Sequence, residues 1–167
     1  MKKHFLSYFF VFLCMAGQSQ NKAIDSLDGI LRTAKNDIDK TQALNAMANA
    51  YKTVDPKKMQ DYALQALQLS QRIQYRIAEG EARLNLGNAA IIQGDYGKAL
   101  QHFAAAQTVF ENELPSDAKN KQRTQNGLAK DYGSIGIVFA EQSNYAKALQ
   151  YHLKSVKIYE ADRKSVV

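Results

Sequence analysis

The segment NLGNAAIIQGDYGKALQHF, residues 85–103, returns later in the chain as SIGIVFAEQSNYAKALQYH, residues 134–152. The two copies align without a gap at an offset of 49 residues, and the tetrapeptide KALQ recurs unchanged. A weaker copy precedes them, in which Ala48 stands 39 residues before Gly87 and the turn is one residue shorter. Self-similarity at such a period is the sequence signature of a repeat architecture.

Each copy predicts two helices joined by a tight turn. In the central copy the apolar residues of each half recur at steps of three or four, which is the period of an amphipathic helix. Gly94 and Asp95 separate the halves, because glycine accepts the left-handed conformation that ends a helix and aspartate caps the next one. Small side chains allow the two helices to approach closely, and an aromatic residue closes the corner of the hairpin.

This pattern resembles the tetratricopeptide repeat family, whose signature combines leucine-glycine with later small and aromatic positions. The resemblance implies an all-α fold in which tandem antiparallel helix-turn-helix repeats form a short right-handed α-solenoid. The positions that carry it, and that we expect to hold the repeats together, are Leu86, Gly87, Gly94, Tyr96, Ala99, Phe103 and Ala106 in the central copy and Gly136, Tyr145 and Ala148 in the third.

The resemblance also divides the chain into units. The family unit has 34 residues, so the offsets of 39 and 49 residues require longer helices or connections. Between the second and third copies, Pro115-Ser116-Asp117 predicts a helix end, a turn and a new N-cap. The expected order is a signal peptide at 1–20, an N-terminal helix at 21–37, repeats at 38–76, 77–117 and 118–162, and a tail at 163–167.

Composition agrees with a helical fold. The chain has 167 residues, of which 46% are hydrophobic, and alanine, glutamine, leucine and lysine favour helices. Two prolines and nine glycines supply too little turn chemistry for an all-β sandwich or barrel. The single cysteine, Cys14, excludes a disulfide framework and a cysteine-based zinc site.

The first twenty residues, MKKHFLSYFFVFLCMAGQSQ, have the three-part pattern of a secretory signal peptide. Cleavage after Ala16 or after Ser19 fits the requirement for small residues, and an uncleaved membrane anchor or a lipid on Cys14 are the alternatives. We therefore expect an exported protein, periplasmic or in the cell envelope, that meets a membrane only through this segment if it is uncleaved. The formal charge is +6, but no basic run with interleaved aromatics indicates nucleic-acid binding.

Catalytic patterns are absent from the sequence. No HExxH, GxSxG, phosphate-binding glycine loop or EF-hand loop occurs. His152 takes the place of Phe103 in the repeat and is expected to be a packing residue, while Glu79 and Glu81 fit a solvated helix face. We expect no enzyme, no cofactor and no metal site.

Recognition of another protein is the remaining function. Stacked hairpins form a curved array whose first helices line the concave face, where amides can bind a peptide backbone and aliphatic residues its side chains. The candidate groove residues are Asn45, Asn49, Lys52, Leu84, Asn88, Ile91, Ile137 and Ala140. Some family members clamp a C-terminal carboxylate, but two of the basic positions of that clamp are Asn45 and Ser134 here, which disfavours it.

The last predicted helix, Tyr145 to about Asp162, carries an apolar stripe with no further helix to cover it. Either the chain is the front part of a longer array, or the stripe pairs with a partner or a second copy. The first alternative would make the chain the input region of a bacterial sensor kinase or transcriptional regulator, and the second leaves a self-sufficient binding scaffold. The stripe consists of Leu149, Leu153, Val156 and Tyr159.

Overall fold

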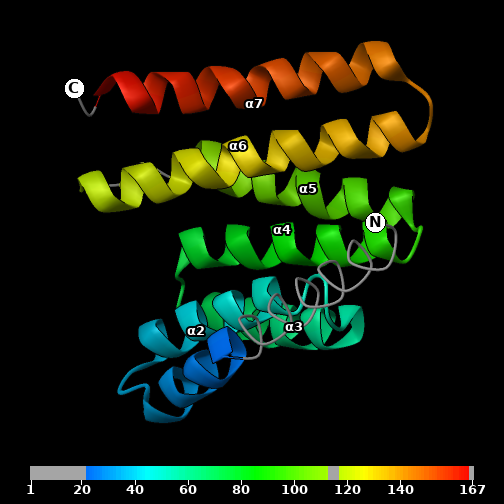
Figure 1. The fold of residues 1–167 in the computed structure, drawn as a ribbon. Coiled ribbons are helices and arrows are strands. Elements are labelled where there is room, and N and C mark those ends of the chain that lie inside the picture. Colours follow the sequence, from blue (N-terminus) through cyan, green and yellow to red (C-terminus); the bar gives the residue numbers. More distant parts are fainter. Residues whose placement is uncertain (1–21, 113–116, 166–167) are drawn as a thin grey trace, which may run out of the picture.

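The computed structural model describes residues 22–112 and 117–165, and every regular element in these ranges is an α-helix (Figure 1). Figure 1 shows three hairpins stacked in chain order, with α7 at one edge. The all-α array of antiparallel hairpins expected from the sequence is confirmed. A helix over 22–33 is followed by α2 (Asp37–Ala50), α3 (Pro56–Arg72), α4 (Arg76–Ile92), α5 (Tyr96–Asn112), α6 (Ala118–Glu141) and α7 (Tyr145–Ser165).

The turn inside the central hairpin has the predicted chemistry. Gly94 adopts a φ of 76°, in the left-handed region that glycine enters without steric cost. The Asp95 carboxylate accepts a hydrogen bond from the Lys98 amide at 2.9 Å and so caps α5. Asp117 caps α6 in the same way through the Asn120 amide, at 2.9 Å. These short polar side chains fix where each helix begins.

Some predicted boundaries differ from the structure. The last helix continues past Asp162 to Ser165, into the expected tail. The turn of the first hairpin is longer than that of the second, not shorter, because α2 already ends at Ala50 and α3 begins only at Pro56, after the cap Asp55. The signal-peptide pattern, the proline and serine before Asp117, and the last two residues lie outside the described part of the chain.

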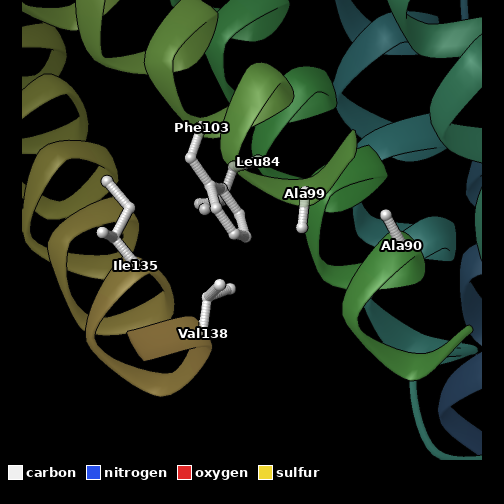
Figure 2. Packing of buried hydrophobic residues seen from close by; sticks show 6 residues of the cluster. All are labelled: Leu84, Ala90, Ala99, Phe103, Ile135 and Val138. Carbon is white, nitrogen blue, oxygen red and sulfur yellow. The ribbon is translucent and has the colours of Figure 1, made fainter. Parts of the chain in front are cut away.

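The core is continuous from the second hairpin into the third. Phe103 of α5 is fully buried and lies in one cluster with Leu84 of α4 and with Ile135 and Val138 of α6 (Figure 2). A side chain at Gly87 would overlap the Phe103 ring, so glycine is required where α4 crosses α5. In the third hairpin the His152 ring lies against Gly136, as its alignment with Phe103 predicts, but unlike the fully buried Phe103 the side chain of His152 is exposed.

Most of the predicted repeat positions are buried, including Leu86, Ala99, Ala106 and Ala148. The two aligned tyrosines differ. Tyr96 packs against the cluster around Phe103, whereas Tyr145 is 70% exposed. The difference follows from position in the stack, because α6 covers α5, and no described helix covers the outer side of α7.

One core position holds an ionisable group. Asp131 of α6 is completely buried, and neither carboxylate oxygen has a hydrogen-bond partner among the described residues. Burial, reinforced by the nearby Glu111 of α5, raises the pKa of Asp131 to about 8. The side chain is therefore protonated at neutral pH, which removes the cost of burying a charge.

None of the helices in the described ranges combines the length and the apolar composition needed to cross a lipid bilayer.

Candidate functional site

A cavity of about 860 Å³ opens along the first helices of the three hairpins, α2, α4 and α6. Because these helices also contact one another across the stack, they form one continuous surface. Side chains of α7 complete the cavity at its far end. We call this surface the groove. Six of the eight predicted residues line it, namely Asn45, Asn49, Lys52, Leu84, Asn88 and Ile137.

The other two predicted residues do not line the groove. Ile91 packs against the hydrophobic cluster around Phe103, and Ala140 is half-buried in the last turn of α6. Both lie near the ends of their helices, beyond the stretch where α4 and α6 face the cavity. Leu84 does line the groove, but it is only 6% exposed and mainly belongs to the core.

Several groove amides already hold the helices together. The Asn45 amide nitrogen donates to the Ala78 carbonyl at 2.9 Å, which joins α2 to α4. Asn85 of α4 donates back to the Asn45 carbonyl at 3.3 Å. Between α4 and α6, the Ser134 hydroxyl donates to Asn88 Oδ1 at 3.0 Å. These bonds fix the spacing of the first helices, so the floor of the groove is preorganised.

A charged link joins α4 and α6 on one side of the groove. Arg123 donates two hydrogen bonds to the Glu81 carboxylate, at 2.7 and 3.2 Å, and a third to the Tyr75 hydroxyl. Burial alone would lower the pKa of Arg123, but the Glu81 carboxylate and Tyr75 outweigh it and hold the pKa above its usual value. The positive charge of Arg123 and the negative charge of Glu81 therefore compensate each other within the groove.

Other polar groups of the groove are available to a ligand. Four polar residues line the groove with side chains that have no hydrogen bond or ion pair to any other residue that the structure describes: Asn49 and Lys52 beside the end of α2, and Asn126 and Lys130 of α6. The amides can donate and accept, and the ammonium groups can only donate. The exposed Ile137 adds an apolar contact between them.

The wall from α7 was not predicted as part of the groove. His152, Ser155 and Tyr159 contribute to it, and the Ser155 hydroxyl donates to the Ala129 carbonyl at 2.7 Å. Burial raises the pKa of Tyr159. Tyr159 was assigned to the outer stripe, yet it lies where that stripe meets the groove. The alignment did not predict that Tyr159 lines the groove, because its counterpart in the central copy, Phe110, lies in the core.

The sequence also missed Arg123 and Asn126. They lie in the first turns of α6, which begins at Ala118 and is longer than α4. At the 49-residue offset Arg123 corresponds to Gln74, which precedes α4, and Asn126 corresponds to the buried Ile77, and neither counterpart lines the groove. A signal was available: an arginine and an amide following the Asp117 cap at helical spacing extend the face that carries Lys130.

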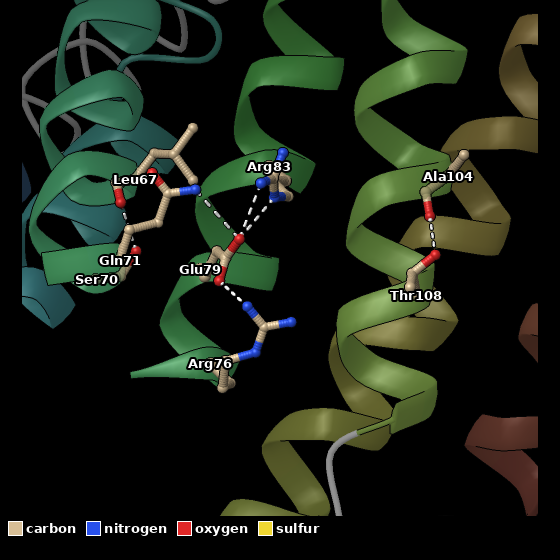
Figure 3. Close-up of polar contacts among 8 residues, drawn as sticks. All are labelled: Leu67, Ser70, Gln71, Arg76, Glu79, Arg83, Ala104 and Thr108. Atoms are coloured by element: carbon tan, nitrogen blue, oxygen red, sulfur yellow. Dashed lines mark hydrogen bonds and ion pairs between the residues drawn. The ribbon is translucent and has the colours of Figure 1, made fainter. Parts of the chain in front are cut away.

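The expectation that Glu79 is solvated was wrong. Glu79 is buried, and its carboxylate is bound by Arg76 and by Arg83, the latter at 2.9 and 3.0 Å, with Gln71 nearby (Figure 3). The two arginines lie three and four residues away on α4, so each can reach it along the same helix. This is a structural ion-pair cluster outside the groove.

His102 lies outside the groove on α5, and burial, followed by repulsion from Lys98 and Arg83, lowers its pKa. Among the described residues no three His, Cys, Asp or Glu side chains gather as metal ligands would.

Solved structures resemble this fold. The chain superposes on the TPR domain of Arabidopsis FLU with a TM-score of 0.59 and 19% identity, covering 75% of this chain and 99% of that one. It also superposes on BtubC from P. vanneervenii with a TM-score of 0.64 and 18% identity, covering 87% of this chain but only 59% of that one. No family model matches the sequence, and no curated protein matches it. The tetratricopeptide-like fold is thus established by structure.

Proposed function

We propose that this protein is a non-catalytic scaffold that binds an extended segment of another protein in its groove. The observation that carries the proposal is the groove itself: a preorganised floor in which Asn49 and Asn126 keep unused hydrogen-bonding groups beside the exposed Ile137. Such amides can bind the backbone of any extended peptide, while the apolar contact receives a side chain. The tetratricopeptide-like fold supports protein interaction in general, and the unused polar groups of the groove support this surface as its proposed site.

The test is a selection of twelve-residue peptides from a random display library, followed by affinity measurements on groove variants. We expect the enriched peptides to bind Asn49→Ala/Ile137→Ala at least fivefold more weakly, because that variant loses a backbone contact and roughly 1 kcal/mol or more of apolar burial. Ile92→Ala is the matched control, since Ile92 is 44% exposed against 43% for Ile137 and lies outside the groove. Equal affinity for both variants would contradict the proposal.

We also propose that the protein is exported to the periplasm or cell envelope. This proposal rests on the signal-peptide pattern of residues 1–20. The alternative function drawn from the sequence is the input region of a bacterial sensor kinase or transcriptional regulator.

A second interaction is proposed for α7. Leu149 and Leu153 are 60% and 59% exposed, and with Val156 and Tyr159 they follow one face of the helix. At the 49-residue offset, Leu149 and Tyr159 correspond to Leu100 and Phe110 of α5. Those two residues pack against the cluster shared with α6 and against Gly127 of α6, respectively. The stripe therefore has the composition of a face that a further helix covers, and we assign that place to a second copy of this chain.

Light scattering after size-exclusion chromatography tests this assignment. We expect a dimer for the protein and a monomer for Leu149→Lys/Leu153→Lys, because two buried lysines would oppose an apolar interface. A monomer for the unmodified protein at tens of micromolar would contradict self-association. Helicity measured by circular dichroism shows whether the variant still folds.

A further inference from the structure

Apart from the ion pair between Arg123 and Glu81, the charged side chains that line the groove are all positive. Glu81 is neutralised by Arg123, whose two hydrogen bonds to it are 2.7 and 3.2 Å long. The other two charged residues that line the groove are Lys52 and Lys130. Both are exposed, and neither has an ion pair among the residues that the structure describes. A ligand in the groove thus meets two ammonium groups and no unpaired carboxylate.

The two lysines lie on opposite sides of the groove. Lys52 follows the end of α2, Lys130 lies in α6, and α4 lies between these helices. Two steps between packed helices amount to on the order of 20 Å. An extended chain advances about 3.3–3.6 Å per residue, so about six residues connect the two positions.

The floor between the lysines suits a peptide backbone. Ser134 occupies Asn88 Oδ1, which leaves the amide nitrogen of Asn88 to donate to a ligand carbonyl. Asn49 and Asn126 offer both kinds of hydrogen-bonding group. These amide contacts do not depend on the ligand's side chains, so a preference for charged side chains has to come from the two lysines.

We propose that the groove selects an extended protein segment with two acidic side chains about six residues apart, one for each lysine. This inference rests on the proposed function. Ammonium–carboxylate hydrogen bonds are about twice as strong as neutral ones, and two like charges repel a basic segment. The carboxylates belong to side chains inside the segment rather than to a chain end, because Asn45 and Ser134 add no charge and already bind neighbouring helices.

The experiment uses the random peptide library with the C-terminus of every peptide joined to a carrier protein, so that no free terminal carboxylate is present. We expect the enriched peptides to be rich in Asp and Glu, with pairs spaced by five to seven positions. Lys52→Gln and Lys130→Gln should each weaken their binding by at least threefold, and the double variant by at least tenfold. Lys57→Gln is the charge-matched control, because Lys57 is exposed on α3 and outside the groove.

The outcomes separate the two levels of the argument. Peptides that depend on Asn49 and Ile137 but are not acidic, or that bind Lys52→Gln/Lys130→Gln unchanged, would overturn the acidic preference and leave the groove as the binding site. Absence of any groove-dependent peptide would overturn the proposed function and this inference together. Loss of binding in Lys57→Gln equal to that in the groove variants would show only a general charge effect, and would also overturn the inference.

Discussion

Asp131→Asn is expected to stabilise the protein, by an amount that grows with pH. Burial holds the pKa of Asp131 at about 8 in the folded chain, whereas an unfolded aspartate titrates near 3.8. Between these two pH values the unfolded state has released the proton and the folded state has kept it. Stability therefore falls as pH rises, by about 1.4 kcal/mol per pH unit, and the loss reaches about 4 kcal/mol at pH 7.

Asparagine resembles the protonated aspartate in shape but cannot ionise. The variant and the original chain should thus be similarly stable near pH 4, and their free energies of unfolding should diverge up to pH 8 and then run parallel. Urea unfolding at several pH values measures this difference. Asp61→Asn, at an exposed position of α3, serves as the control and should show no comparable divergence. A pH-independent difference at Asp131 would contradict a buried, unpartnered carboxyl group.

Phe110→Ala is expected to cost about 3–5 kcal/mol, which is the usual range for a large aromatic residue removed from a core. The Phe110 ring lies between two glycines of different hairpins. A methyl group at Gly80 of α4 would come within 2.6 Å of the ring, and one at Gly127 of α6 within 2.5 Å. The ring therefore joins the second hairpin to the third, and its loss should weaken the whole array.

The contact between the Phe110 ring and Gly127 also predicts the effect of adding a methyl group at Gly127. Gly127→Ala should destabilise by about 1–3 kcal/mol, although alanine favours helices over glycine by about 1 kcal/mol. Gly97→Ala is the control, because Gly97 lies in the exposed first turn of α5 with only Asp95 Oδ1 within 4 Å, and it should be neutral or stabilising. In a Phe110→Leu background the cost of Gly127→Ala should fall, since the two positions are coupled. Equal costs in both backgrounds would contradict the packing.

The hairpins were predictable because their signals are local. Gly94 and Asp95 specify a turn by their own conformational preferences, and the spacing of small and aromatic residues specifies a helix face. The position of Phe103 against Gly87 follows from the same alignment. Where the copies align, the sequence was a sufficient guide to the fold.

The remaining features depend on contacts between hairpins. Gly80 and Gly127 both face Phe110, yet they are 47 residues apart and do not align at the 49-residue offset. Asp131 occupies a core position that helical spacing shares with Ile135 and Val138, and a polar residue on that stripe could have been noticed. The lack of a hydrogen-bond partner for the Asp131 carboxyl group among the described residues could not have been predicted, because it depends on which side chains of α5 lie next to it.

The groove could be predicted only in part, because it too depends on contacts between hairpins. Its first-helix residues follow from the repeat, but the commitment of Asn45 to Ala78, and of Arg123 to Glu81, depends on how far apart the helices lie. These bonds decide which polar groups remain for a ligand. The division into structural amides and available amides therefore required the structure.

Chemical-shift mapping by NMR tests the central claim most directly. The isotope-labelled protein would be titrated with the most strongly enriched library peptide, and the shifted backbone amides assigned. We predict the largest changes at Asn49, Asn88, Asn126 and Ile137, along the groove formed by α2, α4 and α6. Changes confined to α3, α5 or the outer face of α7 would contradict the claim that the groove is the recognition surface.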